Sequence, residues 1–334
     1  MLWLAMARPL RIQYPGAVYH VTCRGNERSD IYKDDADRKR FIQILIQSVT
    51  IYSAKLYSYV LMTNHFHLLI ETPKGNLSEF MRHFNITYTG YYNRRHNRAG
   101  HLYQGRYKSI LVDKNEYLSI LSRYIHLNPV KIKAMKKVPD KEKVKYLIRY
   151  PWSSLPGFIS RRKKEWYIDY VMVLGEYGGD TDKARREYKK RIYSEIAKDA
   201  EIKENILGQS ILGGEAFIAW VKENYIEGVK DRERPSVGEI HRYRSKGDIL
   251  LVVKHETGKD IDAVRAEKGV LRQIVMDLLY RVGGLKGPEI GRLFGIDYGP
   301  VSQERKRLRE KLPKDKKLRM LLGRLECRLS SNEI

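Results

Sequence analysis

The order of apolar and polar residues along the first third of the chain predicts alternating strands and helices. Four runs of β-branched and aromatic residues are typical of strands, at residues 18–23, 56–62, 65–71 and 104–112. The second and third runs are separated only by Thr63 and Asn64, which suit a tight turn. Helical spacing marks residues 34–52, 77–94 and 115–127, the last before Pro129.

The resulting β-α-β-β-α-β-α order is that of ferredoxin-like folds. We therefore predict an α+β domain over residues 8–132, built as a sheet with its helices on one face. Residues 133–234 read as a basic connector with a helical extension, because they contain Pro139, Pro151, Pro156 and helical patterns at 182–200 and 214–225. The charged stretch 230–238 predicts the next boundary, and residues 235–322 carry five helical patterns punctuated by glycine and proline. We expect an all-α domain there.

Charge narrows the class of partner. The 334 residues include 64 Lys and Arg against 40 Asp and Glu, a formal net charge of +24, so the chain is expected to bind a polyanion such as nucleic acid. Only Cys23 and Cys327 are present, which excludes a disulfide framework or a cysteine metal cluster. No apolar run is long enough to span a membrane, and residues 1–6 are too short for a signal-peptide core. We expect a cytoplasmic protein without a membrane partner.

Two short motifs carry candidate chemistry. His65 and His67 are two apart in a predicted strand, so their imidazoles project from one face and are able to share a metal ion. Tyr124 and Asn128 are four apart on a predicted helix and lie on one helical face. Each motif also has a purely structural interpretation: His65 and His67 as a pair of surface or core histidines, and Tyr124 as a helix tyrosine packed under the sheet. His126 lies off the Tyr124 face and reads as structural.

The motifs together resemble a known family. His65-Phe66-His67 fits the signature of the single-tyrosine HUH nucleases, and Tyr124 with Asn128 fits their nucleophile helix. The longer strings 59–69, 101–108 and 124–130, with Arg24-Gly25-Asn26, are similar to the insertion-sequence transposases of this type, closest to the REP-associated tyrosine transposases. The resemblance covers roughly residues 8–160.

This resemblance implies a transposase-like endonuclease and strand transferase that cuts single-stranded DNA beside a hairpin or palindromic repeat. It implies Tyr124 as nucleophile, a 5′-phosphotyrosine intermediate, and His65, His67 and Asn128 as ligands of Mg²⁺ or Mn²⁺. Some relatives act alone and others exchange the tyrosine helix between subunits, so a homodimer stays open. The alternatives are a non-catalytic, sequence-specific DNA-binding regulator of repeat elements and a basic RNA-binding protein, the second of which leaves the His and Tyr motifs unexplained.

Two further segments predict DNA contacts. Between residues 82 and 108 there are six Lys or Arg and no Asp or Glu, interleaved with tyrosines that suit stacking on a single strand, although a solvated basic face fits as well. The residues expected to contact single-stranded DNA are Arg24, Asn26, Arg94, Arg95, Arg98, Arg106, Tyr107 and Lys108.

Residues 287–308 have helix-turn-helix spacing, and residues 235–322 resemble the C-terminal domain of the replication initiator DnaA. The sequence departs from that family at residues 297–301, its most diagnostic string, so origin specificity is not expected. A plain helical hairpin with a basic outer face is the other reading. The residues expected to contact duplex DNA are Ser302, Gln303, Arg305, Lys306 and Arg309.

Overall fold

The computed structural model describes residues 11–196, 206–207, 210–226, 244–285, 287–313 and 315–330. They form two compact units, Pro9–Ile218 and a second one that includes Ala219–Ile334. The boundary predicted at residue 132 falls inside the first unit, and the one predicted at residue 234 lies outside the described residues.

The first unit is built on an antiparallel sheet. Its principal strands are β1 (Ala17–Arg24), β2 (Lys55–Leu61), β3 (His65–Thr72) and β4 (Lys108–Val112). With the short strands β5 (Ile206–Leu207) and β6 (Ile211–Leu212), the order is β2-β3-β1-β4-β6-β5. The predicted order of elements and the ferredoxin-like arrangement of the first four strands are confirmed.

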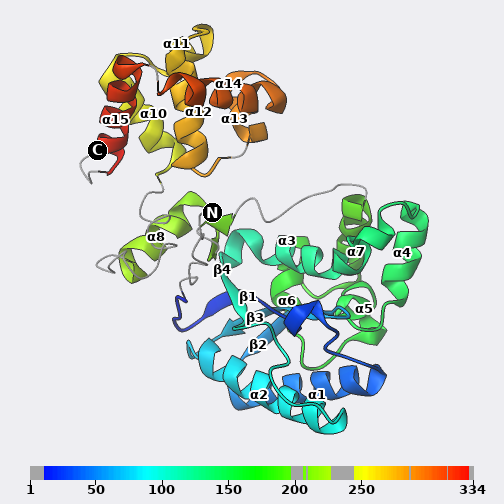
Figure 1. Cartoon of the computed structure of the whole chain (residues 1–334). Coiled ribbons are helices and arrows are strands. Elements are labelled where there is room, and N and C mark those ends of the chain that lie inside the picture. The colour runs from blue at the N-terminus through cyan, green and yellow to red at the C-terminus, as the bar shows by residue number, and fades with distance from the viewer. Residues whose placement is uncertain are drawn as a thin grey trace. The chain divides into compact units, whose positions relative to one another are not determined.

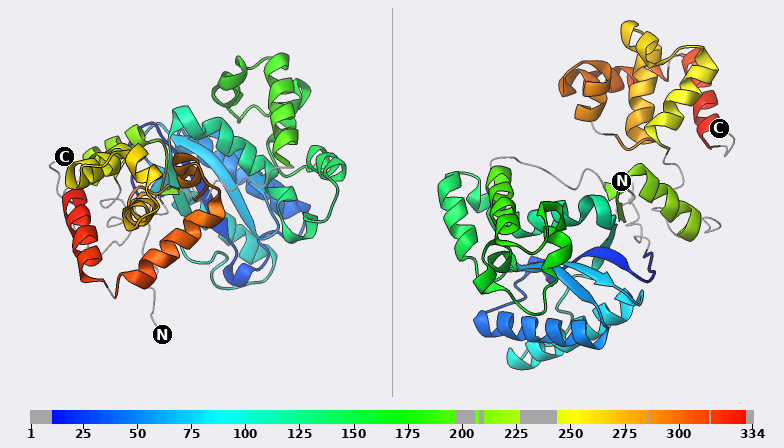
Figure 2. Two further views of the ribbon diagram at one scale, coloured as in Figure 1. Left: turned by 90° about the horizontal axis from the view of Figure 1, so that it is seen from above. Right: turned by 180° about the vertical axis from the view of Figure 1, so that it is seen from behind.

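Helices cover both faces of this sheet (Figure 1). The helices α1 (Asp35–Ile51) and α2 (Leu77–Arg95) pack on one face, where Phe66 of β3 contacts Phe41 of α1 and Phe84 of α2 at ring-centroid distances of 5.0 and 5.8 Å. The helix α3 (Lys114–Leu127) lies on the opposite face, as a second view shows (Figure 2). The prediction of helices on one face is therefore wrong for α3. Strand alternation explains the difference, because His67 points away from Phe66 and toward α3.

Local sequence sets the ends of the helices. The side chains of Asp34 and Asp113 accept hydrogen bonds from the backbone N–H groups of Asp37 and Asn115, and so cap the starts of α1 and α3. After Leu127 the chain passes into a 3₁₀ turn, Asn128–Val130, because Pro129 has no N–H with which to continue an α-helix.

The predicted connector packs onto the sheet instead of linking separate domains. It forms α4 (Asp140–Arg149), α5 (Leu155–Ile159), α6 (Tyr170–Leu174) and α7 (Asp182–Ile196). Backbone N–H groups of Leu61 and Asp169 donate to carbonyls of Trp152 and Leu56, at 2.8 and 2.9 Å, so these residues pair with the edge of β2. An edge strand that is covered in this way is protected from pairing with other chains.

After α8 (Glu215–Tyr225), the second unit is all-α, as predicted. Its helices are α10 (Lys246–Thr257), α11 (Ile261–Ala266), α12 (Val270–Arg281), α13 (Gly287–Phe294), α14 (Tyr298–Lys311) and α15 (Lys316–Ser330). The core gathers apolar residues from α10 to α15, with Ile274 and Leu278 of α12 fully buried. Gly295 has a φ of 65° in the turn between α13 and α14, a conformation that favours glycine.

Candidate active site

The two histidines of the His65-Phe66-His67 motif lie on the face of β3 that α3 covers. Their rings are 5.1 Å apart between centroids with an interplanar angle of 71°. Phe66, between them, points into the core on the other face. The strand alternation expected from the sequence therefore places both imidazoles together on one face.

His65 is held by its neighbour in the hairpin turn. Its Nδ1 lies 2.8 Å from Oδ1 of Asn64. Burial, with a smaller contribution from the charge of Arg24, lowers the pKa of His65 to about 4. The ring is therefore neutral near pH 7, which is the form that binds a metal.

His67 has a partner that sequence reasoning missed. His20 of β1 is buried, its Nε2 lies 2.8 Å from Nδ1 of His67, and the two rings stack with centroids 5.1 Å apart. Burial lowers the pKa of His20 to about 4. His20 could have been found from the sequence, because the ferredoxin-like strand order places β1 beside β3. Alternation of side chains along β1 then puts His20 and Thr22 on the same face as His67.

Tyr124 faces the same group of imidazoles. Its ring stands edge-on to His67 and His20, at centroid distances of 6.3 and 6.1 Å. Nζ of Lys131, a residue that the sequence did not single out, lies 5.5 Å from the centre of the Tyr124 ring. The structure thus places His65, His67 and Tyr124 on the same face of the sheet, between β3 and α3.

Asn128 is bound to its own helix. Its Nδ2 donates to the carbonyl oxygens of Tyr124 and Ile125, at 2.9 and 3.3 Å. The amide nitrogen is therefore used in capping α3, and the amide oxygen is the atom that remains for a metal. Within the described part of the chain, no cluster of three or more His, Cys, Asp or Glu side chains has an arrangement that could hold a metal ion.

A polar network joins α3 to α7 and to Ser154. The ring nitrogens of His126 lie 2.8 Å from the hydroxyl of Tyr188 in α7 and 2.8 Å from Oγ of Ser154. Ser122 contacts the same Tyr188 hydroxyl at 2.9 Å, and Arg123 donates to Glu195 at 2.8 Å. Because the network is buried, α3 and therefore Tyr124 are held in one position against the sheet.

The residues predicted to contact single-stranded DNA divide into exposed and structural ones. Arg24, Arg94, Arg106 and Lys108 are exposed, and Asn26 is half-buried in the turn after β1. Tyr107 is buried, and the guanidinium of Arg11 lies 3.9 Å from its ring centre, so the prediction of a stacking platform is wrong for this residue. Arg98 donates to the carbonyl oxygen of His101 at 2.7 Å and supports that loop.

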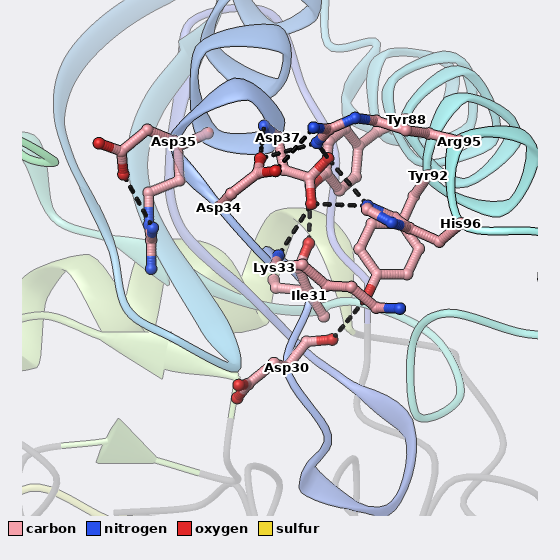
Figure 3. Close-up of polar contacts among 11 residues, drawn as sticks. Asp30, Ile31, Lys33, Asp34, Asp35, Asp37, Tyr88, Tyr92, Arg95 and His96 are labelled. Atoms are coloured by element: carbon pink, nitrogen blue, oxygen red, sulfur yellow. Dashed lines mark hydrogen bonds and ion pairs between the residues drawn. The ribbon is translucent and has the colours of Figure 1, made fainter.

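Arg95 is also committed to the fold (Figure 3). It donates to both oxygens of Asp34, at 2.7 and 2.6 Å, and to the fully buried Asp37, which His96 also contacts at 2.9 Å. These bonds hold the pKa of Asp34 well below its ordinary value. Arg95 therefore joins the end of α2 to the start of α1, and its charge is balanced by two carboxylates. The side chain is exposed, and its contact with DNA stays a prediction.

In the second unit, α13 and α14 form the helical pair that the spacing predicted. Ile290, Phe294, Val301 and Leu308 are buried between these helices and α12. Ser302, Gln303, Lys306 and Arg309 are exposed on α14.

Arg305 differs from these α14 residues, because it is buried. Its guanidinium lies 3.4 Å from the centre of the Tyr280 ring and its Nε lies 3.3 Å from Asp277. The prediction that Arg305 contacts DNA is therefore wrong, since the residue joins α14 to α12.

None of the helices in the described ranges is both long enough and apolar enough to cross a membrane.

Comparison with known proteins bears on the first unit. No curated protein matches the chain. Among solved structures, the chain is similar to a REP-associated tyrosine transposase bound to a REP hairpin, with 17% sequence identity, a TM-score of 0.38, and coverage of 49% of this chain and 93% of that one. Residues 13–128, which contain β1 to β4, Tyr124 and Asn128, match the family model described as "Transposase IS200 like". Over these residues the chain is similar to the IS200-like transposases.

Proposed function

We propose that the first unit cleaves and rejoins single-stranded DNA at hairpins or palindromic repeats, with Tyr124 as the nucleophile. The observation that carries the proposal is the position of the Tyr124 ring, edge-on to His67 on the face of the sheet that also presents His65. The match of residues 13–128 to the IS200-like transposases supports the same reaction class.

A divalent cation fits the donor set of this face. The Nδ1 atoms of His65 and His67 are engaged by Asn64 and His20, so Nε2 is the atom that each ring would turn to a metal. The amide oxygen of Asn128 would be a third ligand, and DNA phosphate oxygens and water would complete the shell. Imidazole with oxygen ligands suits Mn²⁺, and Mg²⁺ is the abundant alternative. Bound there, the ion would neutralise charge on the scissile phosphate as a Lewis acid.

Tyr124 would act by transesterification. Its phenolic oxygen bonds to phosphorus while the bond to the 3′ oxygen of the preceding nucleotide breaks, which leaves a 5′-phosphotyrosine and a free 3′-hydroxyl. The phenol, with an ordinary pKa of about 10, loses its proton as it attacks, and the charge of Lys131 beside the ring favours the phenolate. Because the phosphotyrosine bond stores the energy of the cut strand, attack by a second 3′-hydroxyl rejoins DNA without an external energy source.

The covalent intermediate gives a direct assay. Hairpin oligonucleotides taken from palindromes beside the gene are incubated with the full chain and Mn²⁺ or Mg²⁺, and denaturing gels are examined for a protein–DNA adduct. Wild type and Tyr117→Phe should form the adduct, and Tyr124→Phe should not. Tyr117 is a matched control because it lies two turns earlier on the same helix.

A gel shift of the hairpin without any adduct in wild type would instead indicate a binding-only regulator. The proposal would also be wrong if Tyr124→Phe formed as much adduct as wild type.

We also propose that α14 of the second unit contacts duplex DNA. Support comes from the α13–α14 pair with its tight turn and from the exposed polar and basic residues of α14, which are Ser302, Gln303, Lys306 and Arg309. Binding of the full chain to a duplex of random sequence, and its loss when salt is raised, test this part separately.

A further inference from the structure

We propose that Asn64 is a positioning residue, which fixes the tautomer of His65 and ties that ring to the turn after β1. The inference rests on the proposed function, in which His65 is a metal ligand. Asn64 precedes β3, and both ends of its carboxamide are engaged: Oδ1 lies 2.8 Å from Nδ1 of His65, and Nδ2 donates to the carbonyl oxygen of Arg28 at 2.8 Å.

The chemistry of these partners determines where the His65 proton lies. The Arg28 carbonyl only accepts hydrogen bonds, so the end of the Asn64 amide that faces it is the NH₂ group. The other end is then an oxygen, which also only accepts, so Nδ1 of His65 must carry the hydrogen. A neutral imidazole protonated at Nδ1 has its lone pair on Nε2, the atom that would bind the metal.

The same side chain holds a strained turn. Glu27 and Arg28 have φ values of 52° and 61°, in the left-handed region that residues other than glycine rarely adopt. The turn begins at Gly25, where a Cβ would lie 2.0 Å from the carbonyl oxygen of Ser29, and the Gly25 N–H donates to the Asn64 carbonyl oxygen at 2.8 Å. Asn64 therefore holds the turn at two points: its backbone carbonyl binds the N–H of Gly25, and its side chain binds the carbonyl oxygen of Arg28.

The turn follows Arg24 and contains Asn26, two residues that the sequence predicts to contact single-stranded DNA. A movement of the Arg28 carbonyl on DNA binding would displace the Asn64 amide, and through it the His65 ring. Asn64 thus links the turn, with its two left-handed residues, to the orientation of one proposed metal ligand.

Two substitutions separate the two hydrogen bonds of Asn64. In Asn64→Asp, a carboxylate oxygen still accepts from Nδ1 of His65 but nothing donates to the Arg28 carbonyl. In Asn64→Ala both bonds are lost. Asn76→Ala is the matched control, because Nδ2 of Asn76 also donates to a carbonyl, that of Tyr52 at 3.2 Å, beyond the opposite end of β3.

The first readout needs no metal. Long-range ¹H–¹⁵N spectra of the metal-free full chain, labelled at its 9 histidines, report which nitrogen of each ring carries the proton, and His65→Gln assigns the signal. We expect His65 to be protonated at Nδ1 in wild type, Asn64→Asp and Asn76→Ala, and to lose this preference in Asn64→Ala. Backbone amide exchange in residues 24–31 should accelerate in both Asn64 variants.

The second readout is Mn²⁺ affinity. Asn64→Ala should bind Mn²⁺ about 10- to 100-fold more weakly than wild type, the usual cost of losing a hydrogen bond to a ligand histidine, whereas Asn64→Asp and Asn76→Ala should not weaken binding. A wild-type His65 protonated at Nε2, or an Asn64→Ala protein that keeps the wild-type tautomer or affinity, would overturn the proposal. If wild type bound no Mn²⁺ at all, the metal in the proposed function would be wrong, and the tautomer alone would decide the role of Asn64.

Discussion

Nε2 of His20 lies 2.8 Å from Nδ1 of His67, and the two rings stack across neighbouring strands. The contact joins β1 to the His65-Phe66-His67 motif in β3. Both rings are buried, and His20 lies on the same face of the sheet as His67, so it supports that ring from the neighbouring strand. A histidine that is hydrogen-bonded at Nδ1 in this way is oriented for coordination through Nε2.

Replacing His20 should therefore weaken metal binding without unfolding the sheet. His20→Phe keeps a flat ring in the buried stack but has no ring nitrogen to pair with Nδ1 of His67. We expect Mn²⁺ affinity, measured by calorimetric titration, to fall by about 10- to 100-fold. His83→Phe is the control, since His83 contacts Ser48 between α1 and α2 on the other face of the sheet. Equal affinities of His20→Phe and wild type would show that the stacking is structural only.

Arg95 should matter for stability and not for DNA binding. Arg95→Ala removes the principal cation beside the fully buried Asp37, so the free energy of unfolding should fall. Its second partner, Asp34, is half-exposed and contributes less. Urea denaturation should show this loss for the transition of the first unit. Under conditions where Arg95→Ala is folded, its affinity for hairpin DNA should equal that of wild type, whereas Lys108→Ala should bind more weakly. A selective loss of DNA affinity in Arg95→Ala would instead support its predicted contact with DNA.

The network behind α3 should set the stability of the tyrosine helix. Tyr188→Phe removes one hydroxyl that contacts both His126 and Ser122. Leaving these buried groups without that partner should lower the free energy of unfolding by about 1–3 kcal/mol, measured by urea denaturation. Tyr193→Phe, at a residue of the same α7 that is not in the buried core, should change it little. Similar stabilities for the two variants would mean that α3 is held by apolar packing instead.

Neighbouring basic residues of α14 should behave differently. Lys306→Ala should lower affinity for duplex DNA and reduce the slope of log affinity against log salt by about 1, because the side chain is exposed. Arg305→Ala should mainly destabilise the second unit, since Arg305 pairs with Asp277 and stacks on Tyr280. Salt titrations of binding and thermal denaturation measure the two effects, and an unchanged slope for Lys306→Ala would argue against DNA contact by α14.

Much of the first unit followed from sequence because its signals are local. The periodicity of residues 17–127 predicted the strands and helices in order, and strand alternation placed His65 and His67 on one face. The side of the sheet on which α3 lies was not predictable from helical spacing alone. The apolar pattern of α3 shows that one side of the helix is buried, but it does not specify which of the two faces of the sheet that side packs against.

The errors share a physical cause. Tyr107 and Arg305 were predicted to bind DNA from residue type, but each is buried and engaged by a partner distant in sequence, Arg11 and Asp277 respectively. Long side chains of this kind are charged or polar only at the tip, so composition does not distinguish a surface contact from a buried bridge. The connector was misread for a related reason, because the pairing of Trp152 and Ser154 with β2 is non-local.

The most direct test of the account is to identify the atom that carries DNA after cleavage. A 5′-labelled and an internally labelled hairpin are each incubated with the full chain and Mn²⁺, the adduct is digested with protease and nuclease, and the modified peptide is located by mass spectrometry. The account predicts a 5′-phosphonucleotide on the phenolic oxygen of Tyr124 and a released fragment that ends in a 3′-hydroxyl. A nucleotide on any other residue, or cleavage without a covalent intermediate, would contradict it.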